Sequence, residues 1–202
     1  MPVLILLCHG QSTWNLENKF TVEVDVDLSP VGEEEARRAC IRLENYIIDI
    51  AYTSVLKRAI LTLAIILNEM GKNIPVVRSA TLNERNYGDL QGLNKKETAD
   101  KYDTDQVLLR RRSYETFPPN GESLKETYNR VVPYYKATIK PQLKTDKNIL
   151  IVAHGNNLRA LMMYLENISA TEIVDVNIAN GIPRVYEFSR ELKLETVSYL
   201  EE

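Results

Sequence analysis

Residues 4–12 read LILLCHGQS, and this stretch decides the fold of the chain. A continuous apolar run that ends in His9-Gly10 is typical of a β-strand that is buried on both faces. Residues 150–157, LIVAHGNN, repeat the arrangement around His154-Gly155. Open α/β sheets bind their ligands just beyond the carboxyl ends of the strands, so we expect both histidines to lie in one crevice.

Segments of strand and helix character alternate along the rest of the chain. Ser29-Pro30 predicts a helix start, because serine caps helices and proline suits their first turn. Pro133 and Pro141 should kink or break a later helix. The predicted elements are helices from residue 29, over 55–70, from residue 123 and over 158–165, and strands over 3–7, 48–53, 148–153, 184–188 and 195–200. This alternation predicts an α/β fold, a three-layer sandwich in which helices flank a mostly parallel central sheet.

The composition is that of an ordinary globular protein. The 202 residues are 44% apolar and 26% charged, which predicts a single domain over residues 1–202. A net charge of −3 provides no basic field for nucleic acid or an anionic membrane. The first apolar run is too short for a signal peptide, and Cys8 and Cys40 form no CxxC pair. Both observations favour the reducing cytoplasm.

The two histidines are the strongest chemical signal in the chain. A lone histidine at a strand end is more often structural than functional, but two histidines in matched contexts favour a shared site. A metal site is the rival interpretation, and the sequence offers neither an HExxH run nor a cluster of cysteines and histidines for it. Two histidines without a metal suggest a nucleophile and a group that stabilises the transition state.

Charged residues near the predicted crevice are candidates to assist the histidines. Glu84 lies in the polar segment 82–92 and could act as a general acid–base, with a solvated loop carboxylate as the equal alternative. Arg58 follows the strand predicted over 48–53, where a guanidinium could bind phosphate. A surface cation is the alternative for Arg58, as it is for Lys95 and for the arginine run 110–112.

Several longer runs carry a family resemblance. They are HGQS at 9–12, YTSVLKRA at 52–59, LNER at 82–85, YGDLQGLNK at 87–95, PPNGESL at 118–124 and AHGN at 153–156. With these runs the sequence resembles the cofactor-dependent phosphoglycerate mutases of the histidine phosphatase superfamily over nearly its whole length. It is similar to the shorter form of that family, and the resemblance implies the phosphoglycerate mutase-like fold.

The resemblance also implies roles. His9 would carry phosphate covalently after priming by 2,3-bisphosphoglycerate, Glu84 would donate and accept the proton, and His154 would stabilise the transferring group. The implied reaction is the interconversion of 3-phosphoglycerate and 2-phosphoglycerate in glycolysis and gluconeogenesis, without a metal. The implied partners are phosphoglycerates, and a homo-oligomer stays open. The substrate- and phosphate-binding residues would be Cys8, Gly10, Gln11, Ser12, Asn15, Thr21, Val22, Arg58, Arg85, Asn86, Tyr87, Lys95, Arg111, Arg112, Gly155 and Asn156.

Two departures from the family pattern bear on activity. Cys8 stands where the family has arginine, and a thiol is a weak donor without positive charge. Val22-Glu23 stands where the family has Gly-Trp, and Glu23 would repel an anionic substrate. We therefore hypothesise a mutase with reduced activity. A histidine-type phosphatase and a non-catalytic mutase remnant are the alternatives.

Overall fold

Six strands form the central sheet of the computed structural model, which describes residues 1–22 and 24–201. The strands are β1 (Val3–Cys8), β2 (Ile50–Thr53), β3 (Val76–Arg78), β4 (Ile149–Ala153), β5 (Arg184–Phe188) and β6 (Leu194–Tyr199). They lie in the order β3-β2-β4-β1-β5-β6. The first four strands of this order pair in parallel. Strand β5 pairs antiparallel with β1, and β6 pairs antiparallel with β5. The predicted, mostly parallel sheet is confirmed.

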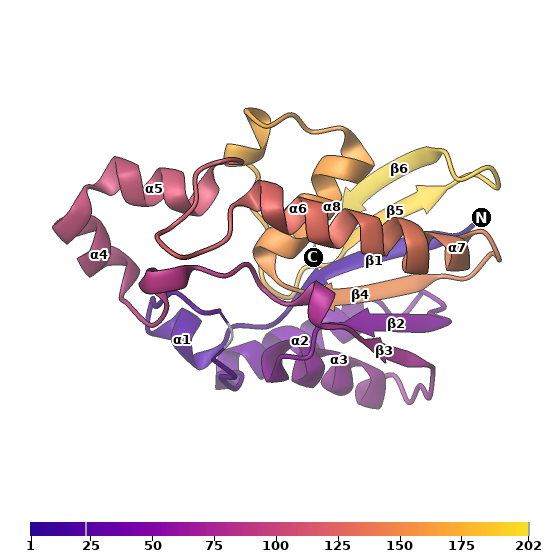
Figure 1. The fold of residues 1–202 in the computed structure, drawn as a ribbon. Coiled ribbons are helices and arrows are strands. Elements are labelled where there is room, and N and C mark those ends of the chain that lie inside the picture. The colour runs from indigo at the N-terminus through magenta and orange to yellow at the C-terminus, as the bar shows by residue number, and fades with distance from the viewer. Residues whose placement is uncertain (23, 202) are drawn as a thin grey trace.

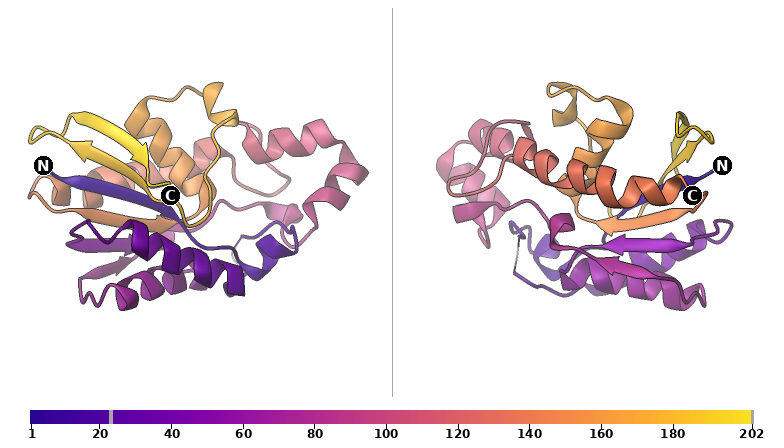
Figure 2. Two further views of the ribbon diagram at one scale, coloured as in Figure 1. Left: turned by 180° about the vertical axis from the view of Figure 1, so that it is seen from behind. Right: turned by 45° about the vertical axis from the view of Figure 1, so that its right-hand side comes forward.

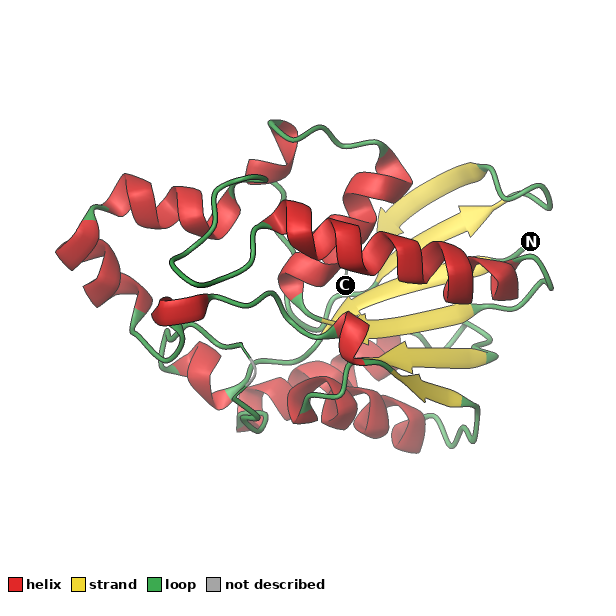
Figure 3. Ribbon diagram, viewed as in Figure 1, coloured by secondary structure: helices red, strands yellow, loops and turns green. Residues whose placement is uncertain are grey.

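Helices cover both faces of this sheet (Figures 1 and 3). The α-helices are α1 (Thr13–Leu16), α2 (Pro30–Arg42), α3 (Lys57–Glu69), α4 (Lys95–Tyr102), α5 (Thr104–Arg112), α6 (Leu124–Tyr134), α7 (Lys140–Leu143) and α8 (Gly155–Glu166). Helices α2 and α3 pack together on one face, and α6 and α8 on the other. The pair α4 and α5 stands apart from both layers, beyond the carboxyl ends of the parallel strands (Figure 2).

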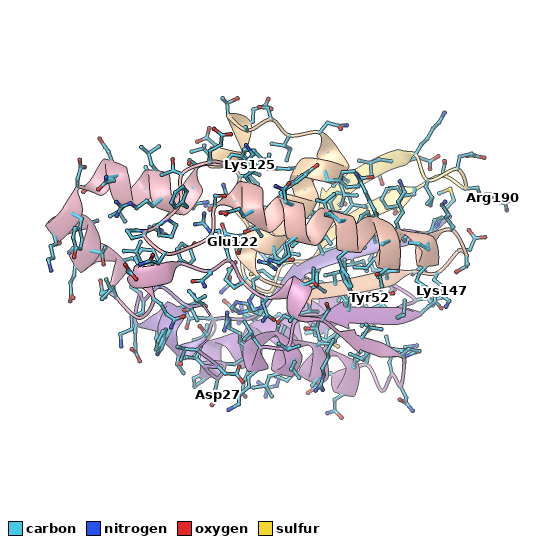
Figure 4. All side chains as sticks on the ribbon, in the orientation of Figure 1. Asp27, Tyr52, Glu122, Lys125, Lys147 and Arg190 are labelled. Atoms are coloured by element: carbon cyan, nitrogen blue, oxygen red, sulfur yellow. The ribbon has the colours of Figure 1, made fainter. Side chains whose placement is uncertain are left out.

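Alternation along β1 explains why its sequence is continuously apolar. Leu4 and Leu6 belong to the apolar cluster under α6 and α8, together with Tyr52 of β2, which Figure 4 labels. Ile5 and Leu7 belong to the cluster under α2 and α3. Strand β4 divides its side chains in the same way. Because side chains of a strand alternate between faces, a strand covered on both sides must be apolar at every position.

Two helix predictions need correction. The helix predicted over 158–165 begins at Gly155, directly after His154. The helix that starts at Ser123, which the sequence predicts to be kinked or broken at its prolines, is not broken there. Pro133 lies inside α6, the chain continues through a π-helical turn at Tyr135–Ile139, and Pro141 falls in the first turn of α7. A wider turn lets a helix continue past a disturbance in its bonding, and proline is tolerated in a first turn because its missing N–H has no partner there.

Gly10 lets the backbone that leaves β1 pass in close contact with the start of α2. A Cβ atom at position 10 would collide with the Gly32 carbonyl oxygen, and one at position 32 would collide with the Gln11 carbonyl oxygen. The serine at position 29 caps α2 by accepting from the Gly32 amide at 3.1 Å, as the sequence predicts. This close approach places the turn after His9 at the carboxyl edge of the sheet.

In the described part of the chain, no helix combines the length and the apolar character needed to cross a membrane.

Candidate active site

Strand pairing brings the two histidines together. Strands β1 and β4 are neighbours in parallel register, with Cys8 opposite Ala153. The next residue on each strand is a histidine, and the ring centroids of His9 and His154 lie 5.0 Å apart. Main-chain register therefore brings the two histidines side by side, as the repeated sequence pattern predicts.

His9 is held as a neutral imidazole. Its Nδ1 lies 2.6 Å from the Gly10 carbonyl oxygen. Because a carbonyl can only accept, Nδ1 carries the proton and Nε2 keeps its lone pair. Burial and the charge of Arg58 lower the pKa of His9 to about 3, against the partly offsetting bond to Gly10. At neutral pH the imidazole is thus uncharged, and the Nε2 lone pair is available, as a nucleophile would need.

His154 has one ring nitrogen engaged and one free. It is fully buried, and its Nε2 lies 2.8 Å from the Ser54 hydroxyl oxygen. Its Nδ1 is buried and has no partner among the described residues. Burial, with the charge of Arg58 and the neighbouring His9, holds the pKa of His154 well below its usual value. Because α8 starts at Gly155, its positive dipole end also faces this site.

His9 lines a small, polar cleft of about 320 Å³ and a narrower pocket of about 90 Å³ that shares several of its lining residues. The fully buried His154 packs against His9 but is not among the residues that line either space. Among the described residues that line the two, Glu84 contributes the one carboxylate, whereas the cations are Arg58, Lys95, Arg111, Arg112 and Arg159. The chain as a whole carries a net charge of −3. Its positive charge is therefore concentrated locally, where an anionic small molecule would bind.

Glu84 is held where it can transfer a proton to a bound ligand. Its Oε1 accepts from the Arg85 amide at 2.7 Å and from Asn156 Nδ2 at 3.3 Å. Its Oε2 accepts no hydrogen bond from the described residues. Glu84 lines both parts of the cleft, together with His9. One anchored oxygen and one available oxygen suit a general acid–base.

Arg58 anchors the loop that follows Thr21. Its side chain is fully buried, and Nη2 donates to the Val22 carbonyl oxygen at 2.9 Å. Its Nε is buried without a partner in the described residues, as is the Thr21 hydroxyl. Arg58 and Thr21 both line the narrow pocket. Glu23, whose carboxylate we expect near the substrate, lies outside the described residues.

The predicted binding residues divide into those that line the cleft and those that do not. The lining residues are Cys8, Asn15, Thr21, Arg58, Tyr87, Lys95, Arg111, Arg112, Gly155 and Asn156. The others are Gly10, Gln11, Ser12, Val22, Arg85 and Asn86. Two of these shape the turn after His9: Ser12 caps α1, and the Gln11 side chain accepts from the Ser29 hydroxyl at 2.9 Å.

Arg85 and Asn86 do not line the cleft, and their side chains bond to backbone groups of the fold. Arg85 is fully buried, and its Nη2 donates to the carbonyl oxygens of Arg110 at 2.9 Å and Arg111 at 3.1 Å. It therefore holds the last turn of α5, from which Arg111 and Arg112 reach the cleft. The exposed Asn86 accepts from the Gly88 amide at 2.7 Å. Both residues thus hold nearby backbone in place and do not contact the cleft.

Four lining residues were absent from the predicted site: Arg159, Asn177, Ile178 and Asn180. Arg159 donates to Asn156 Oδ1 at 3.1 Å and to the Arg112 carbonyl oxygen at 2.8 Å. Burial and the nearby charge of Arg112 lower the pKa of Arg159 to about 10. Helical residues three apart share a face. A predicted helix that began at Gly155, as α8 does, would therefore have placed Arg159 on the same face as Asn156. Asn177, Ile178 and Asn180 lie in a loop, where no periodic sequence pattern points to the site.

Both buried histidines should make the protein less stable in acid. An unfolded imidazole titrates near 6.5, whereas folded His9 stays neutral down to about pH 3. Between these values the unfolded state binds more protons, so stability falls as the pH falls, by up to about 1.4 kcal/mol per pH unit for each such histidine. Denaturant unfolding at pH 7, 6 and 5 should show a steeper loss for the unaltered protein than for His9→Asn. Parallel slopes would contradict the depressed pKa.

In the part of the chain that the structure describes, no group of three or more histidine, cysteine, aspartate or glutamate side chains is placed to hold a metal ion.

Sequence comparisons place the chain among known proteins. Residues 4–196 match the family model described as the histidine phosphatase superfamily (branch 1). A protein of Cytophaga hutchinsonii named 2,3-bisphosphoglycerate-dependent phosphoglycerate mutase is 58% identical over 200 residues, covering 99% of this chain and 94% of that protein. A protein of the same name from Lachnoclostridium phytofermentans is 48% identical over 225 residues, covering 98% and 90%.

Solved structures share the fold at low sequence identity. A mycobacterial glucosyl-3-phosphoglycerate phosphatase, solved with VO3, superimposes with a TM-score of 0.83 at 21% identity, covering 98% of this chain and 96% of the other. An alpha-ribazole phosphatase from Shigella flexneri gives a TM-score of 0.79 at 22% identity, covering 95% of each chain. These likenesses establish the architecture.

Proposed function

This chain belongs to the histidine phosphatase superfamily (branch 1), and from that membership we propose that it is a 2,3-bisphosphoglycerate-dependent phosphoglycerate mutase. It interconverts 3-phosphoglycerate and 2-phosphoglycerate. The observation that carries this conclusion is the 58% identity, across 99% of the chain, to a protein of that name. The cleft supports it, because His9 and His154 lie side by side among cations suited to phosphate and carboxylate groups.

The residues present fit a polyanionic primer. The Thr21 hydroxyl, Arg58 Nε and His154 Nδ1 are buried polar atoms at the site without partners among the described residues. A phosphate oxygen would accept from the Thr21 hydroxyl and from Arg58 Nε. It would also accept from His154 Nδ1 in the tautomer whose Nε2 accepts from the Ser54 hydroxyl. Buried polar atoms are rarely left unpaired without a reason. When bound, 2,3-bisphosphoglycerate supplies the phosphoryl group that primes the enzyme. Arg58, Thr21 and the start of α8 would hold it.

In the chemical step, the Nε2 lone pair of His9 forms a bond to phosphorus while the phosphorus–oxygen bond of the phosphate ester breaks. Glu84 gives its proton to the leaving oxygen and takes a proton from the incoming hydroxyl in the return step. His154 Nδ1 and Arg58 stabilise the charge on the equatorial oxygens. The phosphoryl group thus resides on His9 between the two half-reactions.

The same proposal covers the extent of the catalytic unit, its compartment, its oligomeric state and its need for a metal. The catalytic unit is residues 1–202, it works in the cytoplasm on free phosphoglycerates, and a homo-oligomer is compatible with it. The chemistry needs no metal ion, because His9, Glu84 and the cations supply the nucleophile, the proton and the charge stabilisation.

The test is an enolase-coupled assay of 2-phosphoglycerate formation from 3-phosphoglycerate, with and without 2,3-bisphosphoglycerate. A mutase gives turnover that rises with the primer and releases little inorganic phosphate. Release of inorganic phosphate at the rate of substrate loss would instead identify a phosphatase. Binding of 3-phosphoglycerate with neither product would identify the non-catalytic remnant.

Cys8→Arg is expected to raise mutase kcat/KM by about tenfold or more, because a charged donor binds a phosphoryl group better than a thiol. The thiol is neutral here, since burial, with the charge of Glu84, raises the pKa of Cys8. The matched control is Cys40→Arg, which adds the same charge on α2, away from the cleft. The hypothesis of a weakened mutase would be wrong if Cys8→Arg turned over no faster than the unaltered protein.

A further inference from the structure

The loop of residues 176–180 forms a fixed wall of the cleft. At its start, Arg112 donates to the Val176 carbonyl oxygen at 3.2 Å and to Asn177 Oδ1 at 2.7 Å. At its end, Asn180 pairs with Cys8 in an isolated parallel bridge, and the Gly181 amide donates to the Cys8 carbonyl oxygen at 3.1 Å. The loop is thus tied at both ends to residues that line the cleft.

The turn that follows this loop has little freedom. Gly181 has φ 66°, in the left-handed region that favours glycine. A side chain there would also press on the Glu35 Cβ atom of α2. The half-buried Asn180 is therefore presented to the cleft by a turn that only glycine readily completes.

The side chain of Asn180 contacts Cys8, the uncharged residue at the position where the family that the sequence resembles has arginine. Cys8 Sγ lies 3.5 Å from Asn180 Oδ1. A buried, neutral thiol is a donor, so the amide oxygen faces the sulfur. The oxygen and the Nδ2 group of a carboxamide diverge from the same carbon atom, so with Oδ1 on the sulfur the Nδ2 group is the one turned away from Cys8. In the described part of the chain it makes no hydrogen bond.

Asn180 lines the same cleft as His9, Gly155 and Asn156. His154, which packs against His9 but does not itself line the cleft, has a buried Nδ1 without a partner among the described residues. An unengaged amide group on the cleft wall, among the cations that line it, suits an anionic ligand with several oxygens.

We propose that Asn180 is a substrate-binding residue, whose Nδ2 group donates to an oxygen of the phosphoryl group beside His9 while Cys8 holds the amide in that orientation. Asn180 then replaces, without charge, part of the binding that an arginine at position 8 would provide. Cys8 is a positioning residue that acts through Asn180. The assignment rests on the proposed mutase function for its substrate, although phosphate binding by itself can be measured separately.

The test uses the full chain and two readouts: affinity for inorganic phosphate by calorimetry, and mutase kcat/KM. Asn180→Ala is expected to weaken both about 10- to 100-fold, the usual range for a hydrogen bond to a charged group. Asn180→Asp keeps the shape but adds a negative charge, so it should lose more than Asn180→Ala. The matched control, Asn68→Ala on the exposed end of α3, should leave both readouts unchanged.

A double-mutant cycle tests the role of Cys8. Cys8→Ala should lose less phosphate affinity than Asn180→Ala. Cys8→Ser should recover part of the affinity lost in Cys8→Ala, because serine keeps a donor. The double variant Cys8→Ala with Asn180→Ala should have the affinity of Asn180→Ala alone. Fully additive losses would refute the coupling, and unchanged phosphate affinity in Asn180→Ala would refute the binding role. If the unaltered protein lacks mutase turnover but Asn180→Ala still weakens phosphate binding, the mutase function fails and the assignment of Asn180 stands.

Discussion

His9→Asn is expected to lower mutase turnover by at least ~10⁴-fold, the scale on which enzymes lose rate when a covalent nucleophile is removed. Asparagine can still donate to the Gly10 carbonyl oxygen, which His9 Nδ1 approaches at 2.6 Å. It offers no lone pair in the place of Nε2, so the bond to phosphorus cannot form. The measurement is coupled turnover, together with mass spectrometry of the protein after mixing with 2,3-bisphosphoglycerate.

The phosphorylated species should be present in the unaltered protein and absent from His9→Asn. His154→Asn serves as the comparison, because it removes the second imidazole and leaves the nucleophile. It should be phosphorylated slowly rather than not at all. Full labelling of His9→Asn would show that another residue carries the phosphate and would overturn the assignment.

Glu84→Gln is expected to lower turnover by about 10²- to 10⁴-fold, the usual contribution of general acid–base catalysis. The amide oxygen of glutamine can keep the bonds that Oε1 accepts from the Arg85 amide and from Asn156. What is lost is the ability to give a proton to the leaving oxygen and to take one back. KM should change far less than kcat, since the shape of the cleft is preserved.

The matched control is Glu115→Gln, which neutralises an exposed carboxylate whose partner is Lys125. It should leave turnover unchanged. A Glu84→Gln protein that keeps more than a tenth of the activity would show that a different group, or water, handles the proton.

The layered fold could be predicted because its core elements are long and covered on both sides. The apolar run of β1 and the Ser29-Pro30 start of α2 are local signals that the structure confirms. The pair α4 and α5 gave no such signal, since the buried positions of these helices are Thr98 and Val107 alone. Helices that bury so little show no apolar periodicity. Strand β3, with only three residues, is too short for the pattern to appear.

The proximity of the two histidines could be predicted from repetition, whereas the direction of a charged side chain could not. The same strand-then-histidine pattern, twice, led to His9 and His154. Arg85 and Arg159 show the limit: Arg85, predicted to bind substrate, points into the protein, and Arg159, which was not predicted, lines the cleft. A guanidinium reaches several ångströms from its backbone, and only tertiary packing decides what it meets. Asn180 lies far along the chain from Cys8, so their contact needed the fold.

The parallel register of β1 and β4 has a consequence for how such a protein can change over evolutionary time. The spacing of His9 and His154 depends on hydrogen bonds between backbones, which side-chain substitutions leave in place. Side chains that line the cleft, such as Lys95 and Arg111, can therefore change while the two histidines keep their spacing. A scaffold divided in this way is evolvable: selection can alter what the cleft accepts without having to rebuild the chemistry.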